Sequence, residues 1–194
     1  MSTVKIPMFP LSIFPLPGEL VPLHIFEPRY RQLLEDAEAR DISFGIYLNH
    51  LANTEKLGSL VKLESVIKRY PSGESDIIVK CSDLFTMTTL FRTFSDKLYP
   101  GGEVTFWNAD LSRIVDDKLA GEFTDYLQLL KITQAIQPIT SFGIANELSL
   151  SIEDRLKFVV LDDEKKENFL TSRIRYQSTL LREARKAKDV FHLN

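Results

Sequence analysis

The stretch that decides the fold is KIPMFPLSIFPLPGELVPLHIFEPRYRQLL, residues 5–34. Residues 6–18 are mostly apolar but are interrupted by four prolines. Proline lacks the N–H group that helices and central strands use for hydrogen bonding. We therefore expect this segment to run extended along a sheet edge or in a loop, and residues 20–26 to continue in the same way.

A helix is predicted where this stretch ends, over residues 28–39. Pro28 suits the first helical position because its missing N–H would have no partner there in any case. Apolar side chains then recur at steps of three and four residues, which places them on one helical face. These side chains belong to Tyr30, Leu33, Leu34 and Ala37.

Short runs rich in β-branched and aromatic residues follow this helix, and turn signals separate them. They predict strands over residues 44–48, 60–68, 77–81, 85–91 and 103–109. An open sheet of such strands would leave its edges exposed to other chains. The spacing therefore favours a small closed or half-closed barrel.

The hydrophobic period changes to that of helices from Asp116 onward. One helix is expected to end before Pro138, a short one covers 141–149, and Ser151 and Asp162 are placed to cap two more. The predicted fold class is α+β, with a β-rich barrel and one helix first and a helical bundle second. We expect the two subdomains to span residues 1–113 and 114–194.

Composition excludes several classes of protein. With 194 residues, 44% hydrophobic and 26% charged, the chain is expected to fold rather than stay disordered. It lacks a signal-peptide pattern and an apolar run of about 18 to 20 residues, so we expect a cytoplasmic protein without a membrane partner. The net charge is −3, and only residues 171–194 are basic, which argues against nucleic acid as a partner.

Residues suited to catalysis are scarce. No phosphate-binding glycine loop is present, and the three histidines do not have metal-ligand spacing. Cys81 lies in a strand pattern, so we expect a buried apolar side chain rather than a nucleophile. For His24 a structural hydrogen bond to nearby backbone is favoured over contact with a ligand. We therefore predict no catalytic residue, no metal and no cofactor.

The opening of the chain resembles the N-terminal domain of Lon protease. The resemblance rests on residues 5–11 and 14–30, and it continues at Phe44-Gly45, at 58–61 and at 71–73. It is closest to stand-alone bacterial proteins built of that domain alone, and it weakens at residues 81–85. The resemblance implies a PUA-like pseudo-barrel followed by a helical bundle.

The resemblance also implies a function. In Lon this domain helps to bind protein substrates, whereas the ATPase and Ser-Lys peptidase modules lie further along the chain. We expect this chain to lack both and to be a non-catalytic module for unfolded or client polypeptides. An adaptor role towards a separate ATP-dependent protease is a further expectation. RNA binding, which PUA-like folds also perform, is the alternative.

Candidate binding residues lie in the proline-rich opening. Its prolines restrict the backbone, so a groove built from it would lose little entropy on binding. The candidates combine apolar side chains with side chains that can form hydrogen bonds at a rim: Phe14, Leu16, Leu23, His24, Phe26, Arg29 and Tyr30. The same side chains could instead close the barrel core, and the sequence leaves both interpretations open.

Overall fold

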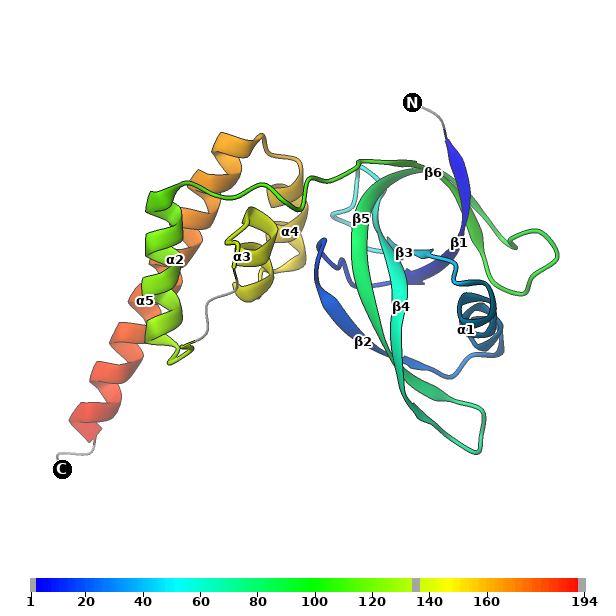
Figure 1. Cartoon of the computed structure of the whole chain (residues 1–194), viewed down its shortest axis with the longest axis horizontal. Helices are drawn as coiled ribbons and strands as arrows, with labels where there is room; N and C mark the ends of the chain where they lie inside the picture. The colour runs from blue at the N-terminus through cyan, green and yellow to red at the C-terminus, as the bar shows by residue number, and fades with distance from the viewer. Residues whose placement is uncertain (1–2, 134–136, 192–194) are drawn as a thin grey trace. The chain divides into compact units, whose positions relative to one another are not determined.

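The computed structural model describes the backbone of residues 3–133 and 137–191 and the side chains up to residue 186. It divides into two compact units, Met1–Asp110 and Leu111–Asn194 (Figure 1). No helix in the described part of the chain is both long enough and apolar enough to cross a membrane.

Unit 1 is a six-stranded sheet with one helix. Its elements are β1 Val4–Leu11, β2 Leu20–Ile25, α1 Pro28–Arg40, β3 Phe44–Leu48, β4 Leu57–Arg69, β5 Ser75–Phe91 and β6 Gly101–Phe106. The strand order is β2-β5-β4-β3-β1-β6, and β6 also pairs with β5. Five strands therefore form a closed ring, and β2 lies outside it. The predicted α+β class with a barrel-like sheet is confirmed.

Strand β5 closes the ring because it is long enough to have different neighbours along its length. It pairs with β2 from Ser75 to Lys80 and with β6 from Phe85 to Phe91. Strand β4 runs along its other side. The first half of β5 therefore pairs with the extra strand β2, and its second half closes the ring by pairing with β6.

Strand β1 corrects the expectation that the first prolines keep their segment at an edge or in a loop. It lies between β3 and β6. Residues 4–7 pair with β6 only, and residues 8–11 pair with β3 only. Because each half has one neighbour, Pro7 and Pro10 can lack an N–H on the other side without breaking a ladder. Only β2, which contains Pro22, is the edge strand that was expected.

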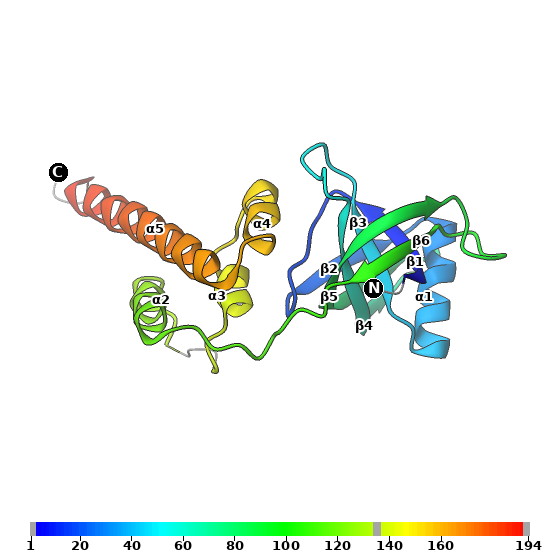
Figure 2. The same ribbon diagram turned by 90° about the horizontal axis from the view of Figure 1, so that it is seen from above.

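Helix α1 forms as predicted, with Pro28 in its first turn and its apolar face buried. It lies against one side of unit 1 (Figure 2). The Tyr30 ring stacks on Phe9 of β1 with centroids 3.9 Å apart. The helix thereby covers a core that also includes Ile77 and Val79 of β5.

Residues 14–17, which we call the buried loop, are the buried part of the segment that connects β1 to β2. Phe14 is 2% exposed and Leu16 is fully buried. The hydroxyl of Ser59, itself fully buried on β4, donates a hydrogen bond of 2.6 Å to the carbonyl of Pro15. The loop is therefore anchored to the sheet by packing and by a hydrogen bond.

Unit 2 is helical, with α2 Asp117–Leu129, α3 Ser141–Glu147, α4 Ile152–Val159 and α5 Asp163–Phe191. Ser151 caps α4 and Asp162 accepts the N–H of Lys165, so both predicted caps are confirmed. Helix α2 ends at Leu129, earlier than the predicted limit before Pro138, and residues 134–136 of that span lie outside the described chain. Helix α5 packs against the other three helices.

Candidate functional site

The structure separates the seven predicted binding residues into two groups. Phe14, Leu16 and Tyr30 are at most 5% exposed. This corrects the expectation that their side chains line a surface, because all three pack in the interior of unit 1. Leu23 is half-buried against the same core. The exposed members of the set are His24, Phe26 and Arg29.

The alternation of β2 explains this separation. Successive side chains of a strand point to opposite faces of the sheet. Val21, Leu23 and Ile25 therefore face the core, whereas Leu20, Pro22 and His24 are exposed. The sheet here is covered on one face and open on the other, so half of an apolar strand remains accessible.

One long edge of β2 is unpaired, since β5 is its only neighbour among the described strands. The Cys81 N–H donates to the Glu19 carbonyl, which by strand alternation directs the backbone groups of residues 21 and 23 towards β5 as well. Those of Leu20, Pro22 and His24 then face away from the sheet. Proline occupies a position on the free side, where a missing N–H interrupts no hydrogen bond within the sheet.

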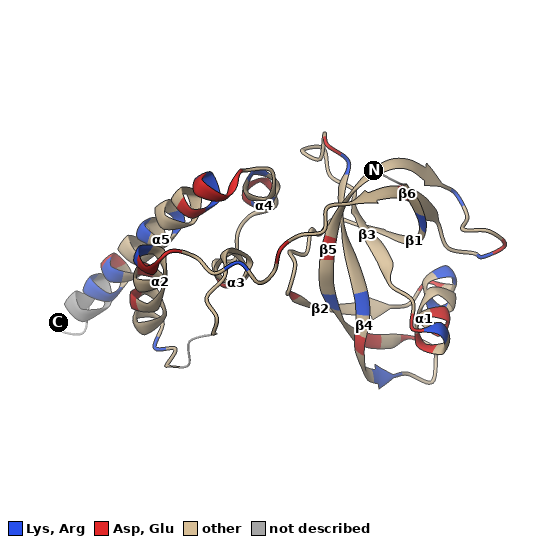
Figure 3. Ribbon diagram, turned by 45° about the horizontal axis from the view of Figure 1, so that its top comes forward, with Lys and Arg blue, Asp and Glu red and all other residues tan. Residues whose placement is uncertain are grey.

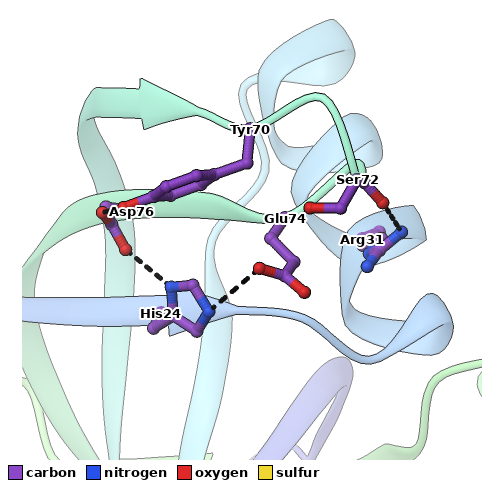
Figure 4. Close-up of polar contacts among 6 residues, drawn as sticks. All are labelled: His24, Arg31, Tyr70, Ser72, Glu74 and Asp76. Carbon is purple, nitrogen blue, oxygen red and sulfur yellow. Dashed lines mark hydrogen bonds and ion pairs between the residues drawn. The ribbon is translucent and has the colours of Figure 1, made fainter.

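A polar cluster, which we call the His24 cluster, lies where β2 ends: His24, Tyr70, Glu74 and Asp76 (Figure 4). His24 Nδ1 lies 2.6 Å from an oxygen of Asp76, and its Nε2 lies 3.6 Å from Glu74. The Tyr70 hydroxyl donates to the other Asp76 oxygen at 2.7 Å. The expectation that His24 would bond to nearby backbone is wrong, because strand pairing places Asp76 directly opposite it.

Hydrogen bonding sets the electrostatics of the His24 cluster. The bond from His24, and then that from Tyr70, hold the pKa of Asp76 below its ordinary value of 3.8. The hydrogen bond between Tyr70 and Asp76 in turn raises the pKa of Tyr70 above its ordinary value of 10.0. Asp76 is therefore a carboxylate with both oxygens engaged, whereas the Glu74 side chain makes a looser contact with His24.

Two aromatic rings, those of Phe26 and Tyr70, lie next to the His24 ring. Phe26 is 55% exposed, and its ring is tilted by 23° from that of His24 with centroids 6.0 Å apart. Tyr70 meets His24 edge-on at 5.9 Å, and Lys68 Nζ lies 4.3 Å from the Tyr70 centroid. Exposed rings beside carboxylates can contact both apolar groups and cations.

Helix α1 holds the adjoining β4–β5 turn in place. Arg31 Nη1 donates a 2.9 Å hydrogen bond to the Ser72 carbonyl (Figure 4). Gly73 has φ +87°, and a Cβ there would lie 2.6 Å from Arg31 Nη1. The turn that carries Glu74 is thus fixed by a contact from the helix.

No motif in the sequence marks Tyr70, Glu74 or Asp76 as site residues. They join His24 only through the register of β2 against β5. A polar side chain inside the predicted hairpin was the one available signal, and many hairpins carry such side chains without a site.

A hollow of about 560 Å³ lies beside β1 and the end of α1, and its lining includes Lys5, Arg40 and Lys97. Asp36 makes ion pairs with Lys97 at 2.8 Å and with Arg40 at 3.7 Å. It also accepts the Tyr99 hydroxyl at 2.7 Å. Two of the three cations are therefore already paired, and this hollow is the weaker candidate.

Cys81 is fully buried, as predicted, and burial raises the pKa of its thiol to about 12. A thiol with so high a pKa is not an effective nucleophile. Within the described side chains, no group of three histidine, cysteine or carboxylate residues is arranged to hold a metal ion.

The fold and the site together define an α+β protein in which a closed sheet carries an exposed edge strand and is followed by a helical unit. Residues 5–180 match the family described as the ATP-dependent protease La (LON) substrate-binding domain. The chain belongs to this family, which confirms the resemblance seen in its first thirty residues.

Solved structures show the same fold. A Lon N-terminal domain protein from Xanthomonas campestris has 23% identity and a TM-score of 0.64, with 91% of this chain and 98% of that one covered. The N-terminal domain of Lon protease from the Mycobacterium avium complex has 15% identity and a TM-score of 0.62, with 89% and 98% covered. A comparison with curated proteins gave no match.

Proposed function

We propose that the protein is a non-catalytic, cytoplasmic module that binds unfolded or client polypeptides and delivers them to a separate ATP-dependent protease. The observation that carries the proposal is the match of a substrate-binding domain family over residues 5–180. The PUA-like character of the closed sheet and the subdomain boundary at residue 113 belong to the same proposal.

The exposed apolar side chains of unit 1 support polypeptide binding. Leu20, Phe26 and Ile67 are 56%, 55% and 64% exposed. All three belong to β2, to the turn after it or to β4. Large apolar side chains that are accessible to solvent can contribute to an interaction surface. Unfolded polypeptides present the apolar segments that such a surface would bind.

RNA binding is the competing function, and only the C-terminal helix favours it. Lys and Arg are frequent along the later part of α5, among them Arg182, Arg185 and Lys186 (Figure 3). The chain as a whole is acidic, with a net charge of −3. Binding to phosphates through this helix would therefore have to overcome the overall charge.

Binding of fluorescent casein and of a structured RNA across a salt series tests the two functions. Casein binding through apolar contacts should persist as salt rises, whereas RNA binding should weaken steeply because counterions are released. Tight RNA binding with that steep slope, and no casein binding, would refute the proposal.

The delivery role needs a separate measurement. Adding the protein to a Lon-type ATP-dependent protease should accelerate casein degradation, while the protein alone should cleave nothing. An unchanged rate, in a mixture where casein binding is verified, would remove delivery from the proposal and leave binding in place.

A further inference from the structure

We propose that the free edge of β2 takes up an extended segment of the bound polypeptide as an added strand, with a lysine or arginine of that segment contacting Glu74 and Phe26. This inference rests on the proposed function, because it specifies how the polypeptide is bound and which sequence is preferred.

The first argument concerns backbone groups. The N–H and C=O groups of Leu20 and His24 and the C=O of Pro22 face away from β5, as the hydrogen bond from Cys81 to Glu19 dictates. An edge of this kind is complementary to an extended chain, which supplies the matching donors and acceptors. Side chains of an added strand would alternate, and those on the outer face would lie beside Leu20 and His24.

The second argument concerns charge. Asp76 already accepts hydrogen bonds from His24 and Tyr70, so it has little capacity for a ligand. Glu74 has more capacity to contact a ligand than Asp76, since its side chain is 36% exposed and lies as far as 3.6 Å from His24 Nε2. The Phe26 ring also neighbours His24, with ring centroids 6.0 Å apart. A carboxylate and an exposed ring that both neighbour His24 favour a basic side chain.

A neighbouring ion pair does not compete for this position. Glu27 is bound by Arg29 through contacts of 2.8 and 2.9 Å. Glu74 and Phe26 are therefore the groups that a basic side chain of the added strand would contact at this end of β2.

The experiment uses the full chain and a short fluorescent peptide of alternating threonine and valine with a central lysine. Two further peptides carry N-methyl groups on alternate amides, each in one of the two registers. Only every second N–H of an added strand faces β2. One methylated peptide should therefore bind at least about tenfold more weakly than the parent, and the other should bind almost equally.

Variants test the basic side chain. Glu74→Gln and Phe26→Ala should each weaken the lysine peptide about threefold, the size expected of exposed charged and cation–π contacts. Glu55→Gln and Leu51→Ala, both exposed in the β3–β4 turn, are matched controls and should change nothing. Replacing the peptide lysine with norleucine should remove the effect of Glu74→Gln.

The outcomes separate the inference from the function. If casein binds but both methylated peptides behave alike, strand addition is wrong and polypeptide binding stands. If Glu74→Gln binds the lysine peptide as tightly as Glu55→Gln does, the proposed contact between Glu74 and a basic side chain is wrong. If neither casein nor the peptide binds, the proposed function itself fails. A dimer in sedimentation that the peptide does not dissociate would assign the edge to a second copy of the chain.

Discussion

Two parts of the same proline-rich opening, residues 14–17 and residues 24–29, differ in their surroundings although both contain large apolar side chains. Phe14 and Leu16 are buried inside unit 1, whereas Phe26 is 55% exposed. The buried loop is bound to β4 through the hydrogen bond from Ser59 to the Pro15 carbonyl. Residues 24–29 run from the end of the edge strand β2 into the first turn of α1. Position relative to the sheet, rather than apolar character, decides which of them can meet a ligand.

Truncating the buried loop should have the largest effect. Leu16→Ala removes a fully buried side chain and leaves a cavity, so the free energy of unfolding should fall by about 2–5 kcal/mol. Urea denaturation followed by circular dichroism measures it. If the free energy of unfolding falls by no more than it does when an exposed side chain is truncated to alanine, the loop is not part of the core.

Removing the anchor of the loop should cost less. Ser59→Ala leaves the buried Pro15 carbonyl with only the weak Cys81 thiol donor at 3.6 Å, and about 1–3 kcal/mol should be lost. Ser82→Ala is the matched control, because the exposed Ser82 hydroxyl donates to the Leu60 carbonyl at 3.2 Å. If both variants unfold at the same urea concentration, the Ser59 bond does not fix the loop.

Two aspartates extend the comparison to charge. The hydrogen bond from Lys97, followed by that from Tyr99, lowers the pKa of buried Asp36 below 3.8. A carboxyl group whose pKa is lower in the folded state than in the unfolded state stabilises the fold at pH values above its unfolded-state pKa. This contribution is lost as the pH falls through the folded-state pKa. Stability should therefore decline as pH drops below about 3.8 towards the folded-state pKa, and Asp36→Asn should flatten that part of the curve.

Asp76 is the exposed counterpart, and its pKa is lowered as well. Salt screens exposed charges more effectively than buried ones. Added salt should therefore reduce the contribution of Asp76 to the pH dependence but retain that of Asp36. Denaturation midpoints of Asp36→Asn and Asp76→Asn at low and high salt test this, and equal salt sensitivity would contradict it.

The smallest effect on stability should come from Phe26→Ala, within about 0.5 kcal/mol, because the ring is exposed. The same variant should nevertheless weaken casein binding measured by fluorescence anisotropy. A loss of stability equal to that of Leu16→Ala would place Phe26 in the core and end the contrast between the two parts of the opening.

Local features of the sequence predicted the helices well. The helix expected over 28–39 is observed at Pro28–Arg40, and Ser151 caps α4 as its sequence indicates. Periodicity and capping depend on neighbours within one or two turns, so a single sequence contains the necessary information.

Pairing between distant residues could not be predicted in the same way. The proline rule placed the first segment at an edge, because nothing in residues 4–11 shows that their two halves pair with different strands. The partners of His24 could not be predicted for the same reason. His24 bonds to Asp76, a residue 52 positions away, and only the register of β2 against β5 joins them.

The ring of strands also has a consequence for synthesis of the chain. Val4 of β1 pairs with Val104 of β6, so the first strand made must wait for the last strand of unit 1. At about 5–20 residues per second the ribosome needs roughly 5–20 s to span that interval. During this time β1 can pair with β3, but its first half has no partner. Unit 1 therefore completes its fold only after β6 has left the ribosome, and nascent chains arrested earlier should be digested by added protease.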